Sequence, residues 1–186
     1  TAYVGANPVS RVKSSTNRAV SQTERAFPAQ AIGAMLSAIE VDLRQAREVE
    51  NAKGVLELER RRWTVALLFG LWARRAEIAR LTMADFTFSQ ATKRWSVLLI
   101  RKGGKEDRLP LADWVMDALV RYRTSLGLSP LPTASEKEKV PAIGRLRTRT
   151  QWENKPVSPE MLYRDVAKTG ARAAQGLRRG EICPAL

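Results

Sequence analysis

The chain has 186 residues, 44% of them hydrophobic and 27% charged, which is the composition of a compact domain with its own core. It contains one cysteine, no histidine and no apolar run of about 18 residues, which excludes an internal disulfide, the usual zinc sites, histidine-based proton transfer and a membrane span. Its 32 basic residues outnumber 19 acidic ones, and the net charge of +13 favours polyanions, of which nucleic acid is the usual one.

The N-terminal part predicts a polar arm followed by helices. Residues 1–26 are polar and carry the turn-forming pair Asn7-Pro8, so we expect a linker or arm there. A helix is predicted from about Pro28, with a polar stretch at 44–54 that either interrupts or extends it. Further helices are predicted over 56–72 and 75–81, where apolar residues again recur at helical spacing.

A period of two residues, typical of strands, follows the helices. Strands are predicted at 86–88, 95–100 and 106–111, the last two joined by a glycine-rich hairpin turn at 102–105. Four tryptophans are spaced as core residues, so we expect no base-stacking platform; they are Trp63, Trp72, Trp95 and Trp114.

The C-terminal part returns to helix. One helix is predicted over 113–126 with Gly127 as its C-cap, and another from Ser158-Pro159 to about Ala174. Residues 128–157 are predicted to form a long loop, and 175–186 no complete element. The fold class predicted is therefore α+β, mainly α-helical with a small three-stranded antiparallel sheet.

Two motifs lie in a strongly basic segment, since residues 60–108 carry twelve basic and four acidic side chains. Arg74 and Glu77 are spaced as arginine, two residues and glutamate, and an apolar helix and Asp85 follow. This pattern resembles the first conserved box of the tyrosine recombinases, the phage-integrase family. That family usually has Gly-Leu before the arginine, where this chain has Trp72-Ala73.

The predicted hairpin resembles the lysine-bearing β-hairpin of the same family. Lys102 takes the place of the catalytic lysine, and Arg108 precedes Leu-Pro-Leu where the family has a basic residue and Val-Pro-Leu. Arg101 stands where the first of two flanking glycines would be, so Lys105 is an alternative to Lys102. Either motif alone is weak, because an Arg-x-x-Glu is usually a solvated helix pair. Their order and their separation of 28 residues indicate the family.

The resemblance implies a DNA recombinase or integrase that breaks and rejoins strands through a 3′-phosphotyrosine, without metal or cofactor. Arg74 would hold the non-bridging phosphate oxygens with its guanidinium fork, and Lys102 would protonate the leaving 5′ oxygen. Glu77 would hold Arg74 or neighbouring groups in place. Four further basic residues are expected to bind DNA: Arg75, Arg101, Lys105 and Arg108.

The family's second box, His-x-x-Arg followed by the tyrosine nucleophile, finds no clear match. The chain has no histidine, and Tyr3, Tyr122 and Tyr163 lie elsewhere than expected for a nucleophile. We therefore expect residues 27–186 to be a partial catalytic domain that is cut before this box and is inactive alone. The alternative is a degenerate second box at 175–178, with glutamine in place of histidine.

The expected partner is double-stranded DNA, on which the intact protein would form a homotetramer. The resemblance implies a bacterial or phage-encoded protein of the cytoplasm, associated with the nucleoid and not with a membrane. Two rival hypotheses remain. One is a catalytically dead DNA-binding module or decoy with the same fold. The other is a basic helical protein that binds RNA, which requires the matches at Arg74 and Lys102 to be coincidental.

Overall fold

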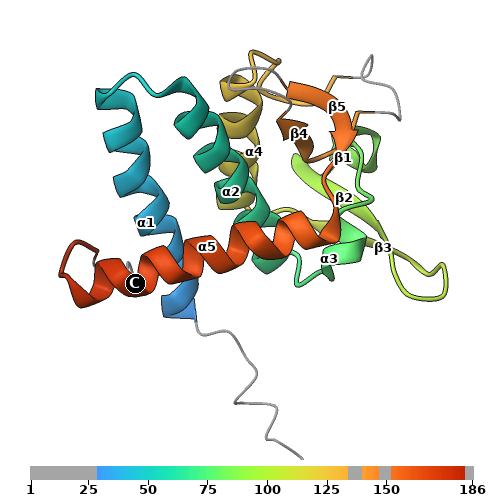
Figure 1. The fold of residues 1–186 in the computed structure, drawn as a ribbon. Coiled ribbons are helices and arrows are strands. Elements are labelled where there is room, and N and C mark those ends of the chain that lie inside the picture. The colour runs from blue at the N-terminus through green and yellow to red at the C-terminus, as the bar shows by residue number, and fades with distance from the viewer. Residues whose placement is uncertain (1–28, 134–139, 147–151, 183–186) are drawn as a thin grey trace, which may run out of the picture.

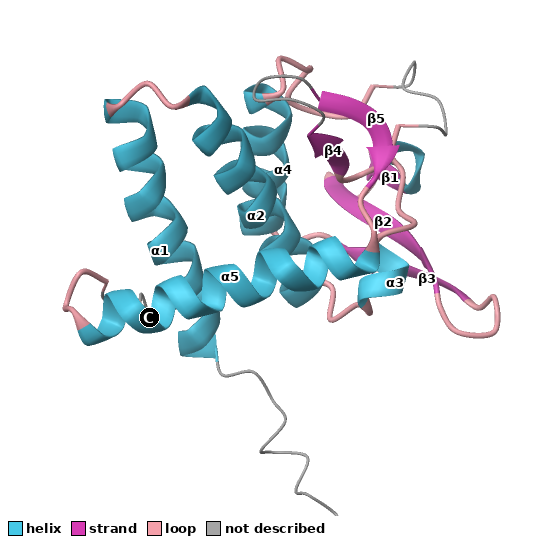
Figure 2. Cartoon of the chain, viewed as in Figure 1, coloured by secondary structure: helices cyan, strands magenta, loops and turns pink. Residues whose placement is uncertain are grey.

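The computed structural model describes residues 29–133, 140–146 and 152–182 (Figure 1). Leu146 and Trp152 are described by their backbone alone. The expected arm at 1–26 and Tyr3 lie outside the described residues. Within the described part, most of the helices lie on one side and the short strands on the other, as Figure 2 shows. This agrees with the predicted α+β class, mainly helical with a three-stranded antiparallel sheet. None of the described helices is long and apolar enough to span a membrane.

The first two helices are α1 (Ala29–Glu48) and α2 (Ala52–Gly70), and they pack side by side. The polar stretch at 44–54 contains the end of one and the start of the other, so it interrupts the helical run only over three residues. Asn51 caps α2, because its side chain accepts a hydrogen bond from the Gly54 amide at 2.9 Å. Helix α2 thus begins four residues earlier than predicted.

A short helix, α3 (Arg75–Ile78), and a 3₁₀ turn, η3 (Met83–Asp85), lead into the sheet. The sheet has the order β1 (Phe86–Ser89), β2 (Arg94–Ile100) and β3 (Glu106–Pro110), all antiparallel. Its register pairs Phe86 with Val97, and Ile100 with Glu106. The three predicted strands and the hairpin turn between the last two are confirmed. Helix α3 is shorter than the predicted 75–81.

The predicted long loop at 128–157 is wrong in part, because it contains a second hairpin of β4 (Gly144–Leu146) and β5 (Trp152–Pro156). These strands are short and their register shifts after Gly144, so no period of two is visible in the sequence. Long-range contacts hold the hairpin in place. The Trp63 indole donates a hydrogen bond to the Ala142 carbonyl at 2.9 Å, and Ile143 is buried in the core.

The last two helices are α4 (Asp113–Ser125) and α5 (Pro159–Arg178). Gly127 follows α4 with a φ of +71°, as its predicted C-cap role requires. Ser158 caps α5 as predicted. Helix α5 runs four residues beyond the predicted end at Ala174, because its last turn packs against Ile182, which would contact any side chain added at Gly176.

Two apolar clusters form the core. One lies between α2, α4 and the three-stranded sheet and contains Trp63, Leu67 and Leu99; the other joins α1, α2 and α5. The prediction that four tryptophans are core residues is wrong for two of them. Trp72 is 71% exposed and Trp114 is 40% exposed. Helical spacing places both on an apolar stripe, but each stands at or beyond a helix end, where the stripe no longer determines burial.

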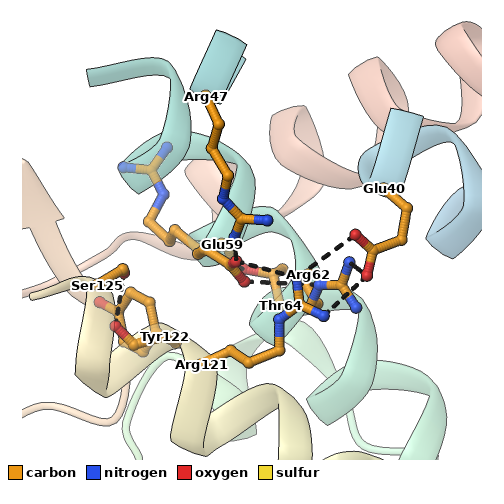
Figure 3. A network of polar contacts seen from close by, with 9 residues as sticks. Glu40, Arg47, Glu59, Arg62, Thr64, Arg121, Tyr122 and Ser125 are labelled. Atoms are coloured by element: carbon orange, nitrogen blue, oxygen red, sulfur yellow. Dashed lines mark hydrogen bonds and ion pairs between the residues drawn. The ribbon is translucent and has the colours of Figure 1, made fainter. Parts of the chain in front are cut away.

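A network of charged side chains joins α1, α2 and α4 (Figure 3). Glu59 is buried and accepts hydrogen bonds from Arg47 and Arg121, while Glu40 is paired with Arg62 and Arg121. Burial alone would raise the pKa of Glu40, but the guanidinium groups of Arg121 and Arg62 outweigh it and hold this pKa below its usual value. The network joins the three helices to one another, and two of them, α2 and α4, pack against the three-stranded sheet.

Candidate functional site

The two sequence motifs meet in space. Arg74 at the start of α3 and Lys102 in the β2–β3 turn line the same open depression, of about 580 Å³, together with Glu77 and Arg101. An adjoining depression of about 410 Å³ is lined by the same four residues and by Trp72. Figure 1 shows α3 beside the sheet from which the β2–β3 turn projects. Residues 28 positions apart in the sequence therefore share a single site.

Glu77 is the buried acceptor at the base of this site. It is 8% exposed, and it accepts hydrogen bonds from the Arg74 backbone amide at 2.9 Å and from the Arg101 guanidinium at 2.9 Å. The Arg74 guanidinium lies farther away, at 3.5 Å. Burial would raise the pKa of Glu77, but these donors outweigh burial and hold the pKa below its usual value. Glu77 is therefore a carboxylate at neutral pH.

Arg101 forms a bridge between α3 and the hairpin. Its guanidinium donates to Glu77 and, at 3.2 Å, to Asp107 on β3. Burial would lower the pKa of Arg101, and the two carboxylates raise it beyond its usual value. The sequence predicted that Arg101 binds DNA. In the structure Arg101 also links α3 to the hairpin, and its two carboxylate partners partly neutralise its charge. Asp107 was not singled out by the sequence, because its role depends on the pairing of Asp107 with Leu99.

The two other cations of the site point to solvent. The Arg74 guanidinium is 69% exposed, and Lys102 is exposed and makes no hydrogen bond or ion pair with another described residue. Lys102 is presented by a tight turn in which Gly103 and Gly104 have φ values of +82° and +77°, a conformation that glycine adopts without strain. Lys105 lines neither depression, so the geometry favours Lys102 over Lys105 as the site lysine.

The remaining predicted DNA contacts lie outside the depression. Arg75 stacks over the ring of Tyr163 on α5, with its guanidinium carbon 5.0 Å from the ring centroid. Arg108 lies on the sheet, where it donates to Thr87 Oγ1 at 2.5 Å and Ser96 Oγ at 3.4 Å. Both are exposed, but neither lines the depressions that Arg74 and Lys102 share. Arg80, which the sequence did not single out, lines the larger depression.

Asp85, the last residue of the first motif, has a structural role. Its carboxylate accepts hydrogen bonds from the backbone amide of Thr82 at 2.7 Å and from the Thr82 hydroxyl at 2.9 Å. This arrangement closes the 3₁₀ turn that carries the chain from α3 into β1. In the first motif, Asp85 and Glu77 therefore hold the backbone in place, while the Arg74 side chain lines the depression.

Neither tyrosine of the described residues lines the depression. Tyr122 is 1% exposed, and its hydroxyl accepts a hydrogen bond from the Gly144 amide at 3.1 Å. Tyr163 is 53% exposed but lines neither depression. Residues 175–178, the alternative second box, are in the last turns of α5 and begin about 18 Å along the helix from Tyr163, whose ring contacts Arg75 of α3. Their position gives no support to the degenerate-box alternative.

Among the residues that the structure describes, no three Cys, Asp or Glu side chains gather into a metal site. No protein-family model matches the chain, and no curated protein matches its sequence. Chemically, the site offers two exposed cations, Arg74 and Lys102, beside an arginine that Glu77 and Asp107 anchor. Such an arrangement suits an oxyanion with several oxygens, such as a phosphodiester, because arginine and lysine donors can bind different oxygens at once.

Proposed function

We propose that the chain is part of the catalytic domain of a site-specific DNA recombinase or integrase of the tyrosine recombinase type. The observation that carries the proposal is the shared depression of Arg74 and Lys102, which belong to two separate sequence motifs. A chance match of either motif would not require them to lie together. Double-stranded DNA as partner, a homotetramer on DNA and a bacterial or phage origin in the cytoplasm belong to the same proposal.

The chemistry assigned to the site follows from charge. In the intact protein, a tyrosine hydroxyl gives its proton to a base and its oxygen attacks the phosphorus, so that a phosphorus–tyrosine bond forms and the bond to the 5′ oxygen breaks. Arg74 stabilises the negative charge that grows on the non-bridging oxygens. Lys102 gives its proton to the departing 5′ oxygen. Glu77 acts through others, because it orients the Arg74 backbone and fixes Arg101 beside the turn.

The backbone before Arg74 also supports the proposal. Trp72 has a φ of +49°, in the left-handed region that glycine favours. The tyrosine recombinase pattern usually has glycine at this position. Position 72, in the turn from α2 into α3, therefore has the backbone conformation for which glycine is favoured, although this chain has a tryptophan there.

A second candidate is a DNA-binding module that keeps the fold without the chemistry. It is consistent with the tyrosines, since Tyr122 is buried and Tyr163 does not line the depression, so the described residues offer no nucleophile there. Both candidates predict duplex DNA as the ligand of Arg74 and Lys102. They differ in whether a covalent protein–DNA bond forms.

The two candidates are separated by testing whether the full product of the gene forms a covalent adduct with DNA. A nicked duplex is the substrate, because it traps such an adduct. For an enzyme, we expect an adduct that Lys102→Ala reduces at least a hundredfold, within the range for loss of a general acid. Replacing the 5′ bridging oxygen by sulfur should restore the adduct in Lys102→Ala, because a thiolate leaves without a proton. The absence of an adduct with either substrate would favour the binding module.

A further inference from the structure

Trp72 is placed where neither packing nor backbone energetics accounts for it. Its side chain is 71% exposed, the highest value among the large exposed hydrophobic residues of the described chain. It makes no hydrogen bond and no ring contact with other described residues. Its φ of +49° is unfavourable for a bulky side chain, and glycine would adopt it without strain. An indole held in this way contributes little to the fold.

The indole nevertheless lies at a defined chemical site. Trp72 lines the 410 Å³ depression together with Arg74 and Lys102, whose charged groups are exposed. An aromatic face beside two cations matches a ligand that combines a flat ring with an anion. A nucleotide unit has both, since its base can stack on an indole and its phosphate can bind the cations.

We propose that Trp72 stacks on an unpaired base of the DNA whose phosphate is held by Arg74 and Lys102. The base must be unpaired or displaced from its stack, because both faces of a paired base within a duplex are covered by its neighbours. The preferred ligand is therefore a duplex that carries an extrahelical or unpaired base next to the bound phosphate. This inference rests on the proposed function only in that Arg74 and Lys102 bind a DNA phosphate.

The test compares two duplexes of the same sequence, one fully paired and one with a single extrahelical 2-aminopurine. Fluorescence anisotropy gives the affinity for each, and the 2-aminopurine emission reports stacking. Wild type should bind the duplex with the extrahelical base at least fivefold more tightly, a lower bound from about 1–3 kcal/mol for base–aromatic stacking, and should quench its emission. In Trp72→Gly the affinity ratio should fall to near one and the quenching should disappear.

Trp114→Ala is the matched control, because Trp114 is a second exposed tryptophan that lines neither depression. It should keep the wild-type affinity ratio and quenching, and thermal unfolding of each variant shows that it is folded. Trp72→Phe should keep part of the ratio, since a smaller ring still stacks.

Each other outcome has a distinct meaning. Equal affinity of wild type for the two duplexes overturns the role of Trp72 and leaves the proposed function in place. If Trp72→Gly still prefers the duplex with the extrahelical base, the proposed stacking is also overturned. It is overturned as well if Trp72→Gly loses the same affinity for both duplexes, because the indole would then insert between paired bases. Binding that is unaffected by Arg74→Ala and Lys102→Ala instead contradicts the proposed function.

Discussion

The carboxylate of Glu77 lies 2.9 Å from the Arg101 guanidinium, and this bond joins α3 to the base of the β2–β3 turn. Arg74 precedes α3 and Lys102 follows Arg101, so the two exposed cations are attached to the two ends of the same ion pair. Their relative position depends on a contact between other residues. The ion pair fixes the backbone positions from which Arg74 and Lys102 extend, while both side chains remain exposed.

Glu77→Gln should weaken both the fold and the site. The amide keeps the shape and one acceptor oxygen but loses the charge that pairs with Arg101, so we expect a loss of about 1–3 kcal/mol in the free energy of unfolding. Urea denaturation measures this loss. Glu160→Gln, an exposed residue in the first turn of α5, is the control and should change stability by less than about 0.5 kcal/mol. Equal stability of the two variants would contradict the structural role of Glu77.

Acid should loosen the same contact. The pKa of Glu77 is below its usual value of 4.5 in the folded protein, so its contribution to stability is complete above about pH 4.5 and declines as the pH falls through the folded-state pKa. Glu40 has a lowered pKa as well and adds to the same trend. Urea denaturation between pH 6 and pH 3 should show this decline, and Glu77→Gln should show a smaller one. An identical pH dependence in both proteins would exclude Glu77 as a contributor.

The ion pair of Arg60 and Asp165 should be essential for attaching α5. Two hydrogen bonds of 3.1 and 3.2 Å join these largely buried side chains, which are 105 residues apart. Asp165→Ala leaves a buried arginine without its charged partner, and we expect a cost of about 3–5 kcal/mol. The double variant Arg60→Met/Asp165→Leu should recover much of that loss, because it removes both charges. A single-variant cost below about 1 kcal/mol would show that solvent replaces the pair.

Sequence periodicity predicted the helices and the three-stranded sheet because each of these elements places its own apolar residues on one face. The β4–β5 hairpin was missed because its position depends on distant contacts such as that of Trp63 with Ala142. In the site, the motifs predicted Arg74, Glu77 and Lys102, and the structure brings these three together. The pairing of Arg101 with Asp107 depends on strand register, and the exposure of Trp72 depends on how α2 ends.

Arg74 and Lys102 should each contribute one phosphate contact to duplex binding. Loss of one contact lowers the slope of log affinity against log salt by about 0.9, so Arg74→Ala and Lys102→Ala should each show this decrease. Both side chains are exposed, and neither substitution should alter unfolding by more than about 0.5 kcal/mol. Lys53→Ala is the control, because Lys53 is an exposed lysine in the first turn of α2, outside both depressions. If both site variants keep the wild-type slope of log affinity against log salt, the depression does not contact DNA phosphates.

Trp72→Gly should leave the stability of the protein unchanged or increase it by up to about 1.5 kcal/mol. The left-handed backbone costs a residue with a side chain about 1–2 kcal/mol, and glycine avoids this cost but loses about 0.5–1 kcal/mol through its greater freedom when unfolded. Few contacts are lost, because the indole is 71% exposed. Thermal and urea unfolding measure the difference, with Trp63→Gly as the contrasting variant, since Trp63 is fully buried and should cost at least about 3 kcal/mol. A loss of more than about 1 kcal/mol in Trp72→Gly would mean that the indole supports the fold, and its place beside Arg74 and Lys102 would then have a structural cause.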